Sequence, residues 1–348
     1  MAMLKKRLII CCDGTWNTPD ETNEGQSAPI NVTKVALGVA PQDSSGIEQR
    51  VFYEKGVGTG RWDRMRGGAL GEGLSAKVKE AYQFLVANYE AGDELFFFGF
   101  SRGAYTARST VGLIRNSGLL MRQHADKVDA AYELYRRRDD ASSPTSVEAE
   151  LFRKSYSYTP RIKFIGVWDT VGELGLPGPA FRFLNKGYEF HDVKLSSWVD
   201  NAFQALAIDE RRKFFEPSVW EQQQHSVGQV VEQVWFAGVH CNVGGGYNTT
   251  GLSDVALRWM VTKAEGCGLA FDRPRFNKII TPDPLDAMRD SKTLLYKAFP
   301  DYNRPIGVTK AGNERVASSA TDRLTKNPDY KPQNLLEYLA RGGKTAQV

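Results

Sequence analysis

One short segment constrains the fold of this chain more than any other. Residues 94–98 form a largely apolar run, Gly99-Phe100-Ser101-Arg102-Gly103 follows at once, and residues 104–113 have helical spacing. A strand that turns this sharply into a helix leaves no room for side chains beside the turn, which explains the glycines at 99 and 103. The pattern predicts a buried strand, a tight turn with Ser101 at its apex, and a helix whose N-terminus faces the serine.

The rest of the chain alternates short apolar runs with longer helical patterns. Further strands are predicted at residues 7–12, 51–54, 162–168 and 233–239, and helices at 74–89 and 194–208. Apolar residues are continuous rather than alternating within the strand runs, as in strands buried on both faces of a parallel sheet. The sequence therefore predicts an α/β protein built on a doubly wound, mostly parallel sheet.

Two segments interrupt this alternation. Residues 120–160 are charged and helical in pattern, and residues 173–230 begin with a loop rich in glycine and proline. We expect both to be helical insertions that form a cap on a single domain spanning residues 1–348, because α/β folds of this length are often one domain.

Composition and charge exclude several classes of protein. The formal net charge is only +4, without the concentrated basic excess typical of a nucleic-acid-binding protein. No apolar stretch reaches the ~20 residues that cross a bilayer, and the run at 8–12 is too short for a signal peptide. The 4 histidines lack the spacing of metal ligands, and the 4 cysteines include no Cys-x-x-Cys pair. We therefore expect a cytoplasmic protein without a metal or a cofactor.

The glycine-flanked serine predicts nucleophilic catalysis, which requires a base and an acid that orients the base. His240 directly follows the predicted strand 233–239, and Asp169 directly follows the strand 162–168. Because the carboxyl ends of parallel strands meet at one edge of a sheet, we expect Ser101, Asp169 and His240 to meet there. The order serine, acid, histidine along the chain is that of the α/β-hydrolases.

Two other carboxylates compete for the role of the acid. Asp254 lies after His240 in the chain, outside the expected order. Asp209 is expected at the end of a helix, where it would pair with a neighbouring arginine. Both stay open as alternatives to Asp169.

Backbone amides near Ser101 are expected to form an oxyanion hole. The amide of Arg102 lies at the start of the predicted helix, and the first strand ends in a loop containing Gly14 and Thr15. An amide from Gly14 or Thr15 would join that of Arg102 in stabilising the negative charge on a tetrahedral intermediate.

An ordered set of motifs runs through nearly the whole chain. The motifs are Cys12-Asp13-Gly14-Thr15-Trp16-Asn17, Gly56-Val57-Gly58-Thr59-Gly60, Gly99-Phe100-Ser101-Arg102-Gly103-Ala104, Val167-Trp168-Asp169-Thr170-Val171-Gly172, Ala205-Leu206-Ala207-Ile208-Asp209-Glu210-Arg211-Arg212 and Trp235-Phe236-Ala237-Gly238-Val239-His240. This set resembles the α/β-hydrolase domain of type VI secretion phospholipase effectors. The resemblance implies an α/β-hydrolase fold, a triad at Ser101, Asp169 and His240, and activity on the acyl esters of glycerophospholipids.

The chain departs from that family in two respects. The family loop after the histidine often carries a carboxylate where this chain has Asn242. The effectors also often carry membrane-binding or delivery domains, so the ester chemistry transfers better than the role of a toxin.

These observations together predict a serine esterase that acts through an acyl-enzyme. The resemblance favours lipid esters, with contact to a membrane surface and with an immunity or delivery partner as further expectations. A small soluble ester is the alternative substrate, and a hydrolase-like binding scaffold without turnover is the non-enzymatic alternative. The apolar loop at 174–184 suits an acyl-binding wall or a membrane-facing lip, and it equally suits inward packing beneath the insertion.

Overall fold

A computed structural model describes residues 5–14, 22–23, 26–56, 69–137, 139–171, 194–223, 226–292 and 299–348. The apolar loop at 174–184 and Thr15 lie outside the described residues. Among the described residues, no helix combines the length and the apolar character that crossing a membrane requires.

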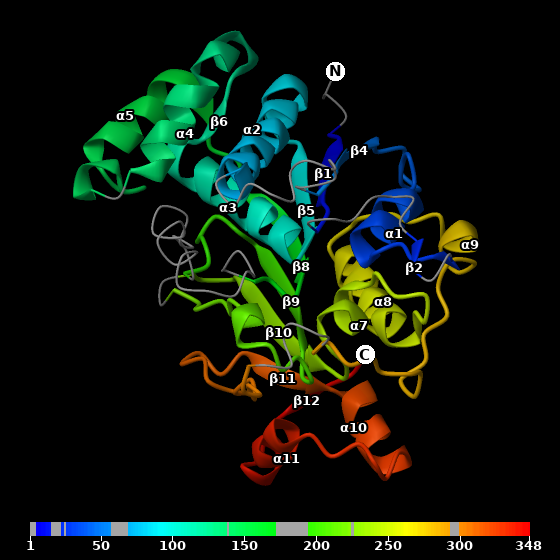
Figure 1. The fold of residues 1–348 in the computed structure, drawn as a ribbon. Helices are drawn as coiled ribbons and strands as arrows, with labels where there is room; N and C mark the ends of the chain where they lie inside the picture. Colours follow the sequence, from blue (N-terminus) through cyan, green and yellow to red (C-terminus); the bar gives the residue numbers. More distant parts are fainter. Residues whose placement is uncertain are drawn as a thin grey trace.

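A sheet of 8 strands runs through the molecule in the order β12-β11-β10-β9-β8-β5-β1-β4 (Figure 1). Its strands are β1 Arg7–Cys12, β4 Gln49–Glu54, β5 Glu94–Phe100, β8 Ile162–Trp168, β9 Asn201–Ala207, β10 Val230–Phe236, β11 Glu314–Ala317 and β12 Thr345–Ala346. Each pair of neighbouring strands in this sheet is parallel. Two short antiparallel pairs lie outside it, β2 Thr22–Asn23 with β3 Gln26–Ser27 and β6 Leu119–Leu120 with β7 Ser157–Tyr158. The prediction of a mostly parallel α/β sheet is confirmed.

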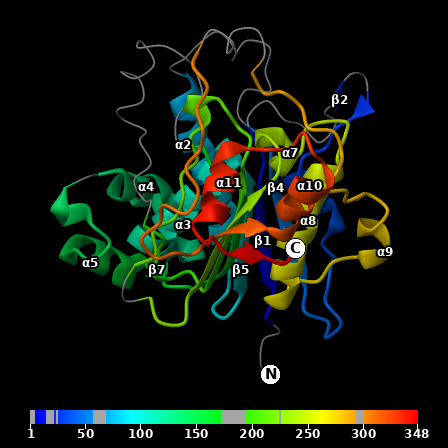
Figure 2. The same ribbon diagram turned by 90° about the horizontal axis from the view of Figure 1, so that it is seen from below.

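Helices cover both faces of the sheet, as Figure 2 shows for α4 and α5 on one side and α8 and α9 on the other. The helices are α1 Asn31–Gly38, α2 Ala69–Asn88, α3 Arg102–Ser117, α4 Val128–Arg136, α5 Val147–Tyr156, α7 His240–Gly244, α8 Gly251–Gly266, α9 Arg273–Phe276, α10 Ser318–Lys326 and α11 Gln333–Ala340, with 3₁₀ turns η2 Arg122–Lys127, η3 Asp140–Ser142 and η4 Lys213–Phe215. Successive residues of β1 serve opposite layers: Ile10 packs in the cluster with α2, α3 and α4, whereas Cys11 packs in the cluster with α1 and α8. The doubly wound arrangement follows from this alternation.

The predicted helix at 194–208 is wrong. Residues Asn201–Ala207 form β9, which lies between β8 and β10 in the middle of the sheet. Its alanines, leucine and glutamine favour helices in isolation, but burial between two helical layers outweighs that preference. Residues 173–230, expected to be a helical insertion, therefore contain a core strand, whereas residues 120–160 do hold α4 and α5.

Candidate active site

Ser101 lies on a strained turn between β5 and α3. Its backbone has φ 56° and ψ −120°, a conformation that costs a non-glycine residue about 1–3 kcal/mol. A Cβ atom on Gly99 would lie 2.6 Å from the carbonyl oxygen of Gly103, and a Cβ atom on Gly103 would lie 2.2 Å from the carbonyl oxygen of Cys12. Only glycine fits at these two positions, so the sharp strand-to-helix turn predicted from the sequence is present.

The side chains of Asp169 and His240 meet at the carboxyl edge of the sheet. Asp169 directly follows β8, and His240 is the first residue of α7, shortly after β10. Nδ1 of His240 lies 2.5 Å from Oδ2 of Asp169, and both side chains are buried. The imidazole also packs against Phe100 and Phe215, with ring-centroid distances of 4.6 and 5.1 Å. These contacts fix the orientation of the imidazole.

Ser101 lies beside this pair on the neighbouring strand. Phe100 is in register with Trp168, so Ser101 and Asp169 are the next residues on adjoining strands. The amide of Ser101 donates to the carbonyl of Trp168 at 3.0 Å. Within the described part of the chain, no hydrogen bond joins the hydroxyl of Ser101 to His240. Catalytic hydrogen bonds of this kind often tighten only when substrate is bound.

Arg304 holds the carboxylate of Asp169 from the other side. It is fully buried, and its Nη1 and Nη2 lie 2.7 and 3.1 Å from Oδ1 and Oδ2 of Asp169. The guanidinium also donates to the carbonyls of Ala207 and Phe215. The amide of Ala207 donates to Oδ1 of Asp169 at 3.0 Å. A charged fork, a backbone amide and an imidazole thus fix one carboxylate.

These contacts set the protonation of the pair. Burial alone would raise the pKa of Asp169, but the charge of Arg304 and the hydrogen bond with His240 outweigh it and hold that pKa well below its usual range. Burial lowers the pKa of His240, although Asp169 opposes the effect. At neutral pH the site therefore holds a carboxylate and a neutral imidazole, the state in which histidine can accept a proton.

Sequence reasoning missed two residues of this site. Nothing in the sequence around Arg304 distinguishes it from other arginines, because its partner lies 135 positions away in the chain. Glu210 was visible in the motif that ends β9. Its Oε2 accepts a hydrogen bond from the amide of His240 at 3.3 Å, and its two oxygens bind Arg212 at 2.8 Å each. Burial would raise the pKa of Glu210, but Arg212 lowers it to about 2.

The two alternative acids have other partners. Asp254 forms a buried ion pair with Lys34, with Nζ 2.5 Å from Oδ1, and accepts a hydrogen bond from Thr250 at 2.8 Å. Asp209 follows β9 rather than a helix and accepts from the amide of Gly238 at 2.6 Å. Of the three predicted carboxylates, Asp169 alone contacts the imidazole among the described residues.

The predicted oxyanion hole is described in part. Arg102 is the first residue of α3, so its amide belongs to the helix terminus that faces Ser101. The amide of Gly14 donates to the side chain of Asp13 at 2.7 Å in this structure. Thr15 lies outside the described residues. No group of histidine, cysteine, aspartate and glutamate within the described residues has an arrangement that could hold a metal ion.

The chain is similar to known proteins over much of its length. The family model for the catalytic domain of Tle1-like phospholipase effectors of the type VI secretion system matches residues 6–263. An uncharacterised yeast protein, YEL023C of Saccharomyces cerevisiae, is 29% identical over 232 residues, which are 60% of this chain and 32% of that protein. The chain thus spans about a third of the length of this relative.

Two solved structures share low sequence identity with the chain. An uncharacterised protein from Pseudomonas aeruginosa is 17% identical, with a TM-score of 0.44, and the match covers 81% of this chain and 48% of that one. The Tle1 effector bound to the VgrG spike of the type VI secretion system is 18% identical, with a TM-score of 0.41, and the match covers 71% of this chain and 52% of that one.

Proposed function

The chain belongs to the family of Tle1-like phospholipase effector catalytic domains of the type VI secretion system, and from this premise we propose that it is a serine hydrolase that cleaves the acyl esters of phospholipids. The observation that carries the proposal is the buried pair of Asp169 and His240, 2.5 Å apart, beside the strained Ser101. A carboxylate that orients a neutral imidazole next to a serine at a helix N-terminus is the arrangement that activates a serine hydroxyl.

In the proposed reaction, Ser101 attacks the carbonyl carbon of the ester while Nε2 of His240 takes the hydroxyl proton. Asp169 stabilises the resulting imidazolium through its contact with Nδ1. The tetrahedral intermediate collapses, the C–O bond to the alcohol breaks, and His240 returns the proton to the leaving oxygen. Water then attacks the acyl-enzyme by the same route, which releases a fatty acid and restores Ser101.

The backbone around Ser101 supports the negative charge of the intermediate. The N-terminus of α3 carries a partial positive charge and follows Ser101 directly. We assign the amide of Arg102 to the oxyanion hole, with the second donor at Gly14 or Thr15. The amide of Gly14 would have to leave Asp13 to serve in this role.

Labelling with a fluorophosphonate tests the serine mechanism. The wild-type protein should become covalently labelled, and the Ser101→Ala variant should not. Ser44→Ala is the matched control, because Ser44 is exposed and lies far along the chain from the turn at Ser101. Equal labelling of the wild type and Ser101→Ala would refute the assignment of the nucleophile, and absence of labelling in both would favour the binding scaffold.

Hydrolysis rates for esters of increasing acyl-chain length test whether the substrate is a lipid. Phospholipid vesicles, lysophospholipid and short-chain p-nitrophenyl esters should be compared at equal enzyme concentration. The proposal expects kcat/KM to rise with acyl-chain length, whereas a small soluble ester as substrate would give the opposite order. A cytoplasmic location and an immunity or delivery partner stay predictions, since the VgrG spike is the partner of the solved Tle1 effector.

A further inference from the structure

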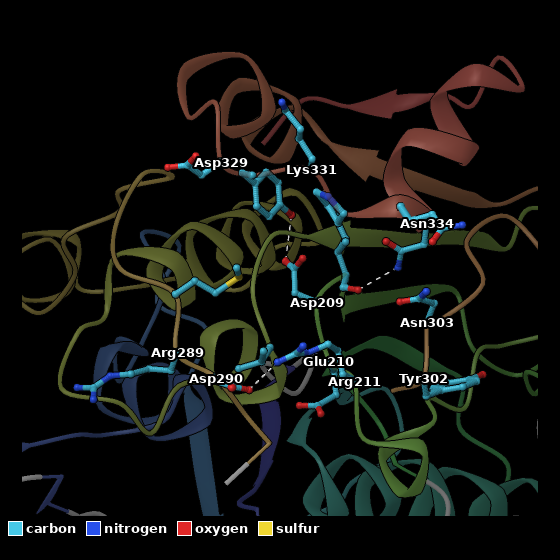
Figure 3. Close-up of a pocket in the computed structure, with 16 residues that line it drawn as sticks. Asp209, Glu210, Arg211, Arg289, Asp290, Tyr302, Asn303, Asp329, Lys331 and Asn334 are labelled. Carbon is cyan, nitrogen blue, oxygen red and sulfur yellow. Dashed lines mark hydrogen bonds and ion pairs between the residues drawn. The ribbon is translucent and has the colours of Figure 1, made fainter. Parts of the chain in front are cut away.

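A cavity of about 400 Å³ opens at the carboxyl edge of the sheet, next to the proposed active site (Figure 3). Asp209 and Glu210 line it from the end of β9, and Val239, the neighbour of His240, lines it from the end of β10. Tyr330 and Lys331, from the segment between α10 and α11, close the opposite side. The volume lies within the range of small-molecule sites in proteins.

Most charges in the wall of this cavity neutralise one another. Glu210 is bound by Arg212, and Arg211 lies 2.9 Å from Asp290. Arg289 donates to the side chain of Asn248 at 2.7 Å. Glu210 and Arg211 therefore have charged partners within the protein.

Asp209, a half-buried residue of the cavity wall, differs from the other charged residues. Its Oδ2 accepts hydrogen bonds from the amide of Gly238 at 2.6 Å and from the hydroxyl of Tyr330 at 3.0 Å, and both donors are neutral. The described residues supply no partner for its Oδ1. The nearest cations that affect it are Arg211 and Arg323, neither of which forms an ion pair with it. One carboxylate oxygen is therefore left for a ligand.

The rim of the cavity adds one charge of each sign. Asp329 and Lys331 are exposed, and neither forms an ion pair with another described residue. The two rim charges balance. Arg289 adds a positive charge to the wall, because Asn248 is neutral, and Asp209 is the carboxylate inside the rim that forms no ion pair with a described residue. A cavity with the carboxylate of Asp209 in its wall and Lys331 at its rim fits a molecule whose cationic end lies against Asp209 and whose anionic part stays at the rim.

We propose that this cavity binds the ammonium group of an amino-alcohol phosphodiester, with the ammonium on Oδ1 of Asp209 and the phosphodiester near Lys331. The origin of this ligand rests on the proposed function, under which the ligand is the head group of an aminophospholipid. It remains on the leaving alcohol when the acyl ester is cleaved. The motif Asp209-Glu210-Arg211-Arg212 then has two tasks, because Glu210 supports His240 while Asp209 selects the head group.

The protonation of Asp209 couples to this binding. Burial raises the pKa of Asp209 to about 6, against the lowering effects of Gly238, Tyr330, Arg323 and Arg211. An ammonium at Oδ1 would lower that pKa again, because it stabilises the carboxylate. Binding should therefore weaken as the pH falls through about 6, where the empty site takes up a proton.

Calorimetric titration of the Ser101→Ala protein tests the proposal without turnover. sn-Glycero-3-phosphoethanolamine, ethanolamine and glycerol 3-phosphate are the probes. We expect glycerophosphoethanolamine to bind at pH 8, to bind at least tenfold more weakly at pH 5, and to lose at least tenfold in affinity when Asp209→Asn is added. Asp322→Asn is the matched control, because Asp322 is exposed on α10 and does not line the cavity, and it should change the affinity by less than twofold.

The outcomes separate this proposal from the proposed function. Equal affinity of the Ser101→Ala protein with and without Asp209→Asn, or equal binding of glycerol 3-phosphate and glycerophosphoethanolamine, would overturn the ammonium site. Tight binding of ethanolamine alone would support the ammonium site and overturn its assignment to a phospholipid head group. If the Asp209→Asn variant does not fold, the pH dependence of the parent protein decides. A failure of fluorophosphonate labelling would refute the hydrolase and leave these binding results standing.

Discussion

Asp169, which is fully buried, and Asp209, which is half-buried, lie at one edge of the same sheet, and their pKa values move in opposite directions. They follow the neighbouring strands β8 and β9. The pKa of Asp169 lies well below its usual range, whereas the pKa of Asp209 is raised to about 6. Burial favours the neutral form in both, so burial does not explain the difference.

The difference comes from the partners. Asp169 faces the guanidinium of Arg304, fully buried with it, while the partners of Asp209 are an amide and the hydroxyl of Tyr330. A charged partner outweighs the rise in pKa that desolvation causes, whereas neutral donors offset only part of that rise. Arg304 therefore keeps the carboxyl of Asp169 ionised, so that it can orient the imidazole of His240. The carboxylate of Asp209 has no cationic partner of this kind, and a bound cation would stabilise it.

The largest effect is expected from Asp169→Asn. The amide removes the charge that stabilises the imidazolium and presents a donor to Nδ1, which disfavours the tautomer that accepts the proton of Ser101. We expect kcat for ester hydrolysis to fall by about 10⁴-fold. Steady-state kinetics would check this, with circular dichroism to show that the fold persists. A loss of less than tenfold would exclude Asp169 as the acid.

Arg304→Met should come next. It leaves the buried carboxylate of Asp169 without its charged partner, which costs on the order of 3–5 kcal/mol of unfolding free energy. The loss of a nearby cation also raises the pKa of His240, so the pH below which kcat/KM falls should move upward. Arg304→Lys keeps the charge but not the fork, so it should restore the pH profile better than the stability. Denaturant unfolding and a pH–rate profile separate the two effects, and an unchanged profile for Arg304→Met would show that the arginine is only structural.

Much of this site was predictable because it depends on strand ends. A parallel sheet gathers the residues that follow its strands, so Ser101, Asp169 and His240 could be placed at one edge from the strands at 94–98, 162–168 and 233–239. The need for glycine at positions 99 and 103 was equally predictable, because a sharp strand-to-helix turn leaves no room for a side chain there.

The rest depends on contacts that sequence order hides. Arg304 reaches Asp169 from the segment before β11, and neither β11 nor β12 was predicted, because the polar C-terminal region shows little apolar patterning. β9 was mistaken for a helix because its composition favours helices while its burial decides otherwise. The expected pairing of Asp209 with a neighbouring arginine was wrong for the same reason, because Asp209 follows a strand and its carboxylate accepts from Gly238 and Tyr330 instead.

Asp209→Asn should remove a pH dependence of stability that is opposite in sign to the one that Asp169 imparts. The pKa of Asp209 rises on folding from 3.8 to about 6, so its penalty is absent below about pH 4 and complete above about pH 6. The asparagine variant should therefore gain unfolding free energy relative to the wild type across that window, by at most roughly 3 kcal/mol. Asp169 contributes stability above its unfolded pKa and loses it as the pH falls. Urea unfolding at pH 4, 5, 6 and 7 measures the difference, and a gain that is constant with pH would contradict the assigned titration.

The smallest effect is expected from Tyr330→Phe, which removes one neutral donor and leaves the charge of Asp209 in place. The hydroxyl of Tyr330 lies 3.0 Å from Oδ2 of Asp209 and lowers its pKa. Without it the pKa should move above 6, and the unfolding free energy at pH 8 should fall by about 1 kcal/mol. Carboxyl ¹³C NMR would follow the titration. Tyr302→Phe is the control, because its hydroxyl bonds Glu216 and should leave Asp209 unchanged. If both variants shift Asp209 equally, a general change in the cavity sets its pKa, and the contrast with Asp169 no longer rests on the kind of partner.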